Sequence, residues 1–336
     1  MSTTQAPSSH ATSPTPKIEL HVHLEGALRP KDLLEIASRN GIALPADNEA
    51  DLTNLYRFRD FDHFIELWMM TTSVIRMERD FRDVVVSYAQ EATSHGAVYI
   101  EGIFTPAERV SGGVSWDEVF SGFCDGADEA RERFGLEVRL TPDIPRTFDL
   151  EVGMETARYA VKYRERGVVG LGLGGPEVGY PPEPFERAFL LAKDGGIGSV
   201  PHAGEVAGAE SIRGAIDVLR ADRIRHGIRS VDDRGVVGDL VDRGIVCDVC
   251  PVSNLRTGAV SNLTDHPLAE MLDAGVLCSI STDDPAMFDT DLTREYQTAE
   301  TLGCSPERAF SAGVRGALCD ERTRSHLQRI GDSFGW

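Results

Sequence analysis

Short apolar runs that alternate with helical segments are the feature that most restricts how this 336-residue chain can fold. Eight such runs occur, and a segment of helical periodicity separates each from the next. Strands that alternate with helices at this spacing form parallel sheets, and eight units are typical of a closed barrel. The sequence therefore predicts an α/β protein, a (β/α)8 or TIM barrel. The predicted strands are residues 17–23, 97–104, 136–142, 168–173, 197–201, 223–226, 244–250 and 276–281.

One domain is expected for residues 17–336, because no stretch rich in Pro, Gly or Ser divides them. Residues 1–16 are mostly Ser, Thr and Pro, which predicts a disordered tail. Residues 44–77 form a long insertion after the first strand. Aromatic residues at helical spacing in this insertion belong either to the core or to a mobile lid over the barrel mouth. Residues 292–336 are expected to add further helices at the C-terminus.

Charge and composition exclude several classes of partner. The formal net charge of −20 argues against nucleic acid or an anionic membrane surface, since both require a basic footprint. No apolar run approaches the roughly 20 residues that a membrane-spanning helix needs. A small molecule is therefore the expected partner, while the oligomeric state stays open. Six scattered cysteines without a secretion signal favour reduced thiols in the cytoplasm.

Potential metal ligands stand at the ends of the predicted strands. The first strand ends in His21-Val22-His23, the fifth is followed by His202, and the eighth by Asp283. Residues i and i+2 of a strand face the same side, so both histidines of the first strand can point into the barrel mouth. Three imidazoles and a carboxylate suit zinc. The fourth strand has no lysine that could bridge a second ion, and one Zn²⁺ per chain is expected.

Three further polar residues lie at the same strand ends and predict hydrolytic chemistry. A water activated by zinc is a nucleophile near neutral pH, and attack on an aromatic amidine carbon needs a proton donor at the adjacent ring nitrogen. Glu205 is placed to be that donor if an apolar site keeps it protonated. His226 would hold the attacking hydroxide, and Asp284 would bond another ring nitrogen. In isolation, His202 is also compatible with an ordinary interior histidine, and Asp283-Asp284 with a helix N-cap.

These residues lie in segments that resemble the adenosine deaminase family of the amidohydrolase barrels. The matching segments are Pro16 to Gly26 (PKIELHVHLEG), Gly172 to Glu177 (GLGGPE), His202 to Glu205 (HAGE), Arg225 to Gly227 (RHG), Cys250 to Asn254 (CPVSN) with Thr257-Gly258, and Ser281 to Pro285 (STDDP). They span almost the whole chain in the family's order.

The resemblance implies zinc-dependent hydrolysis of the 6-amino group of an adenine nucleoside, adenosine to inosine and ammonia. It implies zinc ligation by His21, His23, His202 and Asp283. Glu205 would then protonate purine N1, His226 would orient the hydroxide, Asp284 would meet N7, and the backbone N–H of Gly175 would meet N3. Gly175, Asp284, Glu25 and His23 are accordingly expected at the substrate.

Two departures from the family pattern leave the substrate open. Adenosine-specific members have Asp where this chain has Glu25, and that Asp meets the ribose 5′-hydroxyl. Relatives that deaminate free adenine share the segment His23 to Gly26 (HLEG). Pro176 also replaces an acidic residue of the adenosine form, as in bacterial relatives that act on aminodeoxyfutalosine, an adenosine with a large 5′ extension. Free adenine and aminodeoxyfutalosine are therefore alternative substrates.

Two rival interpretations concern other classes of protein. A different zinc deaminase architecture uses H-x-E with P-C-x-x-C, and the chain contains His23-Leu24-Glu25 and Cys247-x-x-Cys250. Val246 replaces the required proline, which argues against that architecture. The two cysteines have no second cysteine pair and lie in the apolar run Gly244 to Val249, so buried packing is the preferred interpretation. The second rival is a non-catalytic nucleoside-binding protein on a deaminase scaffold. Its expected signature is a missing ligand or acid, and none is missing here.

Overall fold

The computed structural model describes residues 14–59 and 61–336, so most of the predicted N-terminal tail lies outside the described residues. The described part of that tail ends in Pro16, which is buried. Nine strands form two parallel sheets of order β1-β2-β3-β4-β5 and β6-β7-β8-β9 within the described chain. Their bounds are β1 (Lys17–His23), β2 (Ala97–Phe104), β3 (Glu137–Pro145), β4 (Gly170–Gly174), β5 (Gly198–Ser199), β6 (His202–Ala203), β7 (Arg223–His226), β8 (Val246–Val249) and β9 (Leu277–Ile280).

The two sheets close into the predicted barrel at two seams. At the first seam, β5 lies within the fifth predicted strand and β6 follows it directly; the two are separated at Pro201, which has no backbone N–H to donate. At the second, β1 meets the segment after β9 through a parallel bridge between Val22 and Asp283. The N–H of His23 donates to the Asp283 carbonyl at 2.7 Å, and the Asp283 N–H donates to the His21 carbonyl at 3.1 Å. The segment after β9 therefore joins β1, the strand at which the barrel begins.

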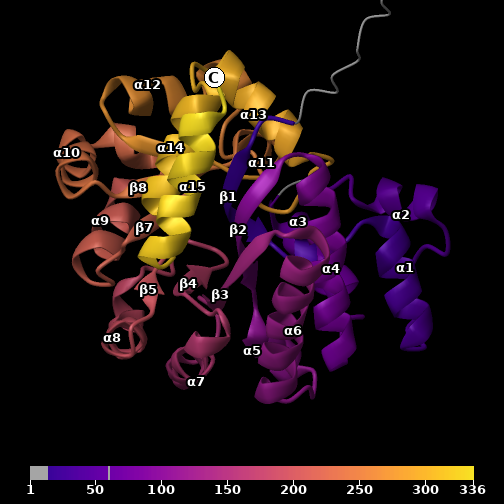
Figure 1. Cartoon of the computed structure of the whole chain (residues 1–336). Coiled ribbons are helices and arrows are strands. Elements are labelled where there is room, and N and C mark those ends of the chain that lie inside the picture. Colours follow the sequence, from indigo (N-terminus) through magenta and orange to yellow (C-terminus); the bar gives the residue numbers. More distant parts are fainter. Residues whose placement is uncertain (1–13, 60) are drawn as a thin grey trace, which may run out of the picture.

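Helices surround the strands on the outside (Figure 1). They are α1 (Pro30–Arg39), α2 (Glu49–Leu55), α3 (Phe61–Thr72), α4 (Glu78–Ser94), α5 (Pro106–Ser111), α6 (Trp116–Phe134), α7 (Leu150–Lys162), α8 (Glu186–Asp194), α9 (Ala209–Asp217), α10 (Arg234–Arg243), α11 (Pro251–Arg256), α12 (Leu268–Asp273), α13 (Leu292–Thr301), α14 (Pro306–Gly316) and α15 (Glu321–Ser333). Short 3-10 turns are η1 (Glu25–Ala27), η2 (Arg164–Arg166), η3 (Glu183–Phe185), η4 (Ile228–Asp232) and η5 (Leu263–Asp265). None of these described helices is long and apolar enough to cross a membrane.

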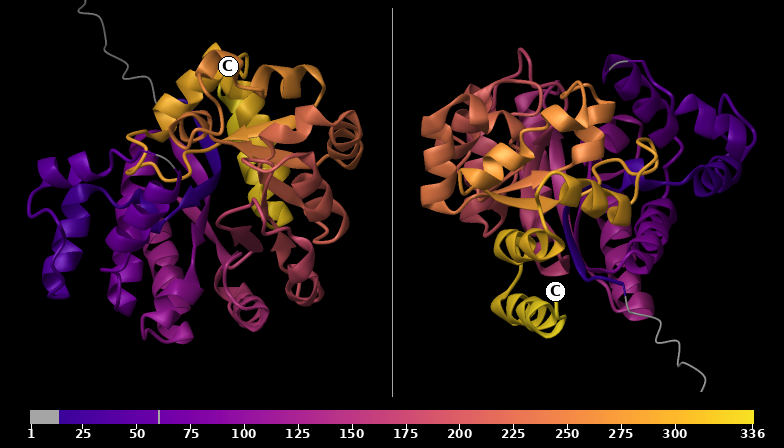
Figure 2. Two further views of the ribbon diagram at one scale, coloured as in Figure 1. Left: turned by 180° about the vertical axis from the view of Figure 1, so that it is seen from behind. Right: turned by 90° about the horizontal axis from the view of Figure 1, so that it is seen from above.

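The additions to the barrel lie at two places. The insertion contains α2 and α3, and α1 and α2 project from one side of the molecule in all three views (Figures 1 and 2). Its helix α3 places the buried residues Phe64 and Trp68 over the barrel mouth, where they line a cavity. The predicted C-terminal helices are α13, α14 and α15. In α14, a side chain at Gly313 would collide with Ile18, so the glycine lets this helix pack directly on β1.

Candidate active site

Four side chains converge at the carboxyl ends of the strands. His21 and His23 come from β1, His202 from β6, and Asp283 from the turn after β9, and their ligand atoms all lie within 4.8 Å of one another. The Nε2 atom of His202 is 3.1 Å from that of His21 and 3.3 Å from that of His23. Asp283 Oδ1 is 3.3 Å from His21 Nε2 and 3.4 Å from His23 Nε2. The structure thus brings together all four predicted metal ligands.

The cluster fits a site for one metal ion. With bonds of about 2.0–2.1 Å, a single ion can reach ligand atoms that lie 3.1–3.4 Å apart, as the four separations given above do. The Nδ1 atom of His202 lies 3.0 Å from the Leu173 carbonyl oxygen, which can only accept. Nδ1 therefore carries the proton, and the Nε2 lone pair points into the cluster. A lone pair directed at the other ligand atoms suits a site that holds a cation.

Asp283 is oriented by its backbone and by one neighbour. Its φ of +67° lies in the left-handed region, which is uncommon for residues other than glycine and is frequent at functional sites. The Ser253 hydroxyl donates to Oδ2 at 2.6 Å, which leaves Oδ1 directed at the histidines. A bend and turn follow Asp283 rather than a helix, so the N-cap interpretation does not hold.

Glu205 has the environment that a proton donor requires. Burial, together with the carboxylates of Asp283 and Glu177, raises the pKa of Glu205 to about 8, so the group is protonated at neutral pH. Oε1 accepts a hydrogen bond from Thr257 Oγ1 at 3.1 Å. Oε2 lies 3.5 Å from His226 Nε2. The acid and the histidine predicted to hold the hydroxide therefore face the same space.

The loop that carries Glu205 is fastened by a second buried carboxylate, Glu177. Its Oε1 accepts from the Gly204 N–H at 2.8 Å and from the Ser211 hydroxyl at 2.8 Å. Its Oε2 accepts from the next three backbone N–H groups, those of residues 205, 206 and 207, at 2.8–3.0 Å. Although burial alone would raise it, these hydrogen bonds lower the pKa of Glu177, so the group stays ionised.

Asp284, in the turn after β9, connects that turn to the insertion. The Trp68 indole N–H of α3 donates to Asp284 Oδ1 at 2.9 Å. Burial and the adjacent Asp283 raise the pKa of Asp284 well above its usual range, which allows a protonated carboxyl to donate to a ring nitrogen. A Cβ on Gly26 would lie 1.6 Å from Asp284 Oδ1, so only glycine leaves room for this carboxyl group.

These groups line a cavity of about 380 Å³, which is within the range of small-molecule sites. His23, His202, Glu205, His226, Asp283, Asp284 and Gly175 face it, and apolar walls come from Phe64, Ile65, Trp68, Met69 and Phe148. Gly175 has a φ of +92°, a conformation that favours glycine. A smaller hollow of about 160 Å³ adjoins this cavity and shares Met69, Glu108 and Phe148 with it.

Glu25 lies beside the cavity and is not among the residues that line it. The side chain is buried, and its Oε1 accepts from the Thr105 N–H at 2.9 Å. Its other oxygen has no hydrogen-bond partner within the described chain. Burial raises the pKa of Glu25 to about 7. Contact between Glu25 and a substrate therefore stays a prediction.

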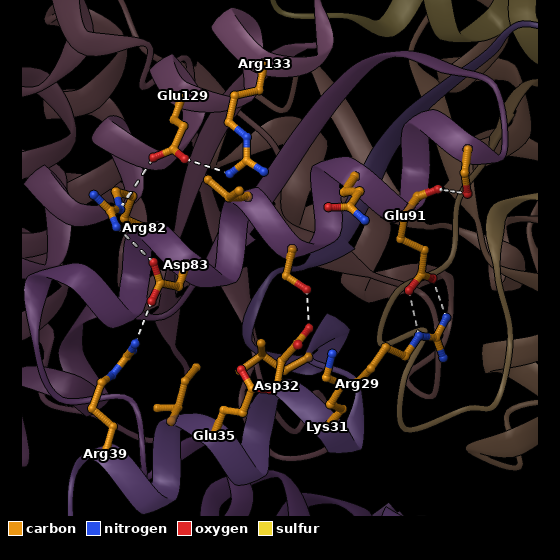
Figure 3. A pocket seen from close by; sticks show the side chains of 16 residues that line it. Arg29, Lys31, Asp32, Glu35, Arg39, Arg82, Asp83, Glu91, Glu129 and Arg133 are labelled. Atoms are coloured by element: carbon orange, nitrogen blue, oxygen red, sulfur yellow. Dashed lines mark hydrogen bonds and ion pairs between the residues drawn. The ribbon is translucent and has the colours of Figure 1, made fainter.

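A larger hollow of about 680 Å³ lies outside the barrel, between α1, α4 and α6. Charged residues line it, and Figure 3 shows each of the four arginines that it labels paired with a carboxylate. Arg82 contacts Asp83 at 3.2 Å and Glu129 at 3.5 Å, and Arg133 contacts Glu129 at 2.8 Å. Because these charges neutralise one another, the chemistry concentrates in the smaller cavity at the barrel mouth.

Several supporting residues were missed by sequence reasoning. Asp143, at the end of β3, has one oxygen 3.4 Å from His202 Nδ1, and its other oxygen accepts from Arg225. It could have been found by the same rule that found the ligands, a polar residue at a strand end. Cys247 and Cys250 are buried and unpaired, as predicted. Cys250 also has its Sγ 3.6 Å from His21 Nδ1, a contact that the sequence did not indicate.

The barrel, its cluster of imidazole and carboxylate ligands and the protonated carboxyl beside it define a hydrolase of the metal-dependent amidohydrolase class. Within that class, the family described as adenosine deaminase matches residues 16–330, and the chain belongs to this family.

Relatives with named activities act on adenine-type substrates. The chain is 51% identical to the aminodeoxyfutalosine deaminase of Acidothermus cellulolyticus, over 96% of this chain and 92% of that protein. It is 39% identical to the adenine deaminase of Streptomyces coelicolor, over 89% of this chain and 88% of that protein. The crystal structure of an adenine deaminase from Arthrobacter aurescens superposes with a TM-score of 0.90 at 32% identity, covering 95% of this chain and 99% of that one.

The family and its named relatives settle the class of reaction. The chain is a hydrolytic deaminase that acts on a C–N bond of an adenine-type substrate. The interpretation as a non-catalytic binding protein is therefore set aside. The H-x-E architecture is set aside as well, because the chain has the barrel of the adenosine deaminase family.

Proposed function

We propose that this enzyme removes the 6-amino group of an adenine nucleoside with a large 5′ substituent, with aminodeoxyfutalosine as its substrate. The observation that carries this proposal is the 51% identity to an aminodeoxyfutalosine deaminase over 96% of the chain. Adenosine, the substrate implied first by the sequence, shares the reacting purine but lacks the extension. Six unpaired cysteines support a cytoplasmic location.

The metal of the site is proposed to be one zinc ion, held by His21, His23, His202 and Asp283. The support is the donor set, three imidazoles and one carboxylate whose ligand atoms all lie within 4.8 Å of one another. When bound, zinc lowers the pKa of a water molecule to near neutrality and so supplies a nucleophile. The remaining chemistry belongs to the side chains around the cavity.

Three polar groups would bind and protonate the purine. Glu205 is placed to give its proton to N1, and its pKa of about 8 keeps that proton in place at neutral pH. Asp284, held by Trp68, would donate to N7. The N–H of Gly175 would meet N3 at the opposite side of the ring, since Gly175 lines the same cavity. His226 would hold the attacking oxygen.

The room beyond the purine supports an extended substrate. The apolar wall formed by α3, together with Phe148, offers a surface for an apolar group. The adjoining hollow of about 160 Å³ adds space past Met69 and Glu108. A free base would leave this region unfilled. The second candidate, free adenine, is favoured by the adenine deaminase relatives and by the TM-score of 0.90.

Kinetics on a panel of substrates tests the proposal. The zinc-loaded enzyme would be assayed with aminodeoxyfutalosine, adenosine, 2′-deoxyadenosine, 5′-methylthioadenosine and adenine, with ammonia release as the readout. We expect kcat/KM for aminodeoxyfutalosine to exceed that for adenosine and adenine by about 100-fold, equivalent to about 2.7 kcal/mol of extra binding in the transition state. A higher kcat/KM for adenine would overturn the extended substrate in favour of the second candidate.

A further inference from the structure

A chain of three buried polar side chains leads from the barrel wall to the active site. It consists of His266, which follows η5, Asn254 of α11, and His226 at the end of β7. Asn254 Nδ2 lies 3.1 Å from His226 Nδ1, and Asn254 Oδ1 lies 3.2 Å from His266 Nε2. The neighbouring residue on α11, Ser253, orients Asp283, so this short helix supports both the ligand cluster and the histidine beside it.

The direction of the hydrogen bonds in this chain is fixed at its outer end. The backbone N–H of Leu268 donates to His266 Nδ1 at 3.1 Å, and a backbone N–H can only donate. Nδ1 of His266 is therefore unprotonated, and the single ring proton is on Nε2. Burial lowers the pKa of His266 to about 4, which keeps the ring neutral. Its Nε2–H donates to Asn254 Oδ1, and the amide NH2 group of Asn254 then faces His226.

If the hydrogen bonds ran in the opposite direction, from His226 to His266, two hydrogen-bond donors would face each other. If His226 carried its proton on Nδ1, that proton would meet the NH2 group of Asn254 at 3.1 Å, and both would be unsatisfied in a buried site. Rotating the amide would only move the conflict, since its NH2 group would then meet the Nε2–H of His266. Asn254 is fully buried, so water cannot relieve either arrangement.

We propose that Asn254 and His266 are positioning residues that fix His226 as the tautomer with its proton on Nε2. In this tautomer the lone pair is on Nδ1, and Nε2–H points toward Glu205 Oε2 at 3.5 Å and Asp283 Oδ2 at 3.7 Å. His226 then holds the attacking oxygen by donating a hydrogen bond to it and does not accept a proton from it. The tautomer of His226 follows from the hydrogen bonds alone. Only the identity of the oxygen that His226 holds rests on the proposed function.

The ring nitrogens of His226 provide the direct test. The zinc-loaded enzyme would be labelled with ¹⁵N-histidine, and long-range ¹H–¹⁵N spectra would separate protonated from unprotonated ring nitrogens. The resonances of His226 among the nine histidines are those lost in His226→Gln. We expect a protonated Nε2 and an unprotonated Nδ1. A proton found on Nδ1 would overturn the proposal whatever the substrate proves to be.

Three variants test the hydrogen-bonded chain of His266, Asn254 and His226 itself. Asn254→Asp places a carboxylate acceptor against Nδ1, so the His226 proton should move to Nδ1 and kcat should fall about 100-fold with KM changed less than about threefold. His266→Gln keeps an N–H donor near Asn254 Oδ1, so it should keep the tautomer of His226 and leave kcat within about threefold of wild type. His266→Leu removes that donor, so it should keep neither the tautomer nor the wild-type kcat.

Two controls distinguish an effect on the His226 tautomer from disruption of the fold. Asn262→Ala alters the exposed turn just before His266, where Asn262 bonds only nearby residues, and should leave the His226 resonances and kcat unchanged. Zinc content should equal wild type in every variant. If Asn254→Asp left the ring nitrogens and kcat at wild-type values, Asn254 would not set the tautomer. If wild type itself deaminated none of the panel, the proposed substrate would fail while the spectra still decided the tautomer.

Discussion

Replacing Glu177 with glutamine should loosen the loop that carries Glu205. Glutamine has one acceptor oxygen, and its NH2 group must face donors in place of the other oxygen. The less costly orientation directs NH2 toward the Gly204 N–H and the Ser211 hydroxyl, because the hydroxyl can rotate to accept. One backbone N–H then stays buried without an acceptor, at about 1–3 kcal/mol. The three remaining N–H groups lose a charged acceptor, at about 1 kcal/mol each.

The total expected cost is about 4–6 kcal/mol, much of it concentrated in residues 204–207. Two measurements on the zinc-loaded Glu177→Gln variant would check this. Hydrogen exchange should show the amides of residues 204–207 opening far more often than in wild type. The kcat should fall at least about tenfold, because an acid displaced by about 1 Å transfers its proton poorly.

Glu186→Gln is the matched control. It removes the same charge from an exposed position in the first turn of α8, and it should leave both measurements unchanged. If exchange at residues 204–207 and kcat in Glu177→Gln equalled those of this control, the five hydrogen bonds to Glu177 would not be what positions Glu205.

Three further predictions concern the acid, the metal and pH. Glu205→Gln should keep zinc bound while kcat falls 10²- to 10⁴-fold, the usual contribution of a general acid, and a wild-type rate would exclude Glu205 as the donor. Exhaustive chelation should abolish activity and lower the Tm, with both restored by zinc, and full activity in demonstrably metal-free enzyme would refute the metal site. Burial raises the pKa of Glu295 to about 8, so the folded state binds this proton more tightly than the unfolded chain, and the resulting stability is lost as pH rises through about 8. Between pH 5 and pH 9, wild type should therefore lose on the order of a few kcal/mol of unfolding free energy relative to Glu295→Gln, and parallel pH profiles for the two proteins would contradict this reasoning.

The periodicity of the chain was sufficient to predict the barrel, and local chemistry explains the departures. The fifth strand was predicted as one run, but β5 and β6 are separated at Pro201, which has no backbone N–H to donate. The helices α5 and α11 were not predicted. Each has only six residues, too few to show a helical period, although both begin with proline, a known start signal.

The four residues predicted as ligands, which the fold brings together, could be proposed because strand ends and i, i+2 spacing depend on local sequence alone. The residues that support them could not be found in that way. Trp68 and Asp284 are 216 positions apart, and only the folded chain brings them together. Asn254 was quoted only as part of a motif, since a single buried asparagine on a short helix has no periodic signal. The positive φ of Asp283 likewise depends on the bridge to β1 and not on its own residue type.

The bridge between Val22 and Asp283 links metal binding to closure of the barrel. Two imidazoles belong to β1, the first strand, and the carboxylate to the turn after β9, more than 250 positions later, so a partly assembled barrel does not hold the full donor set. We therefore expect a nick or a slipped register anywhere between them to weaken metal binding before the helix content changes.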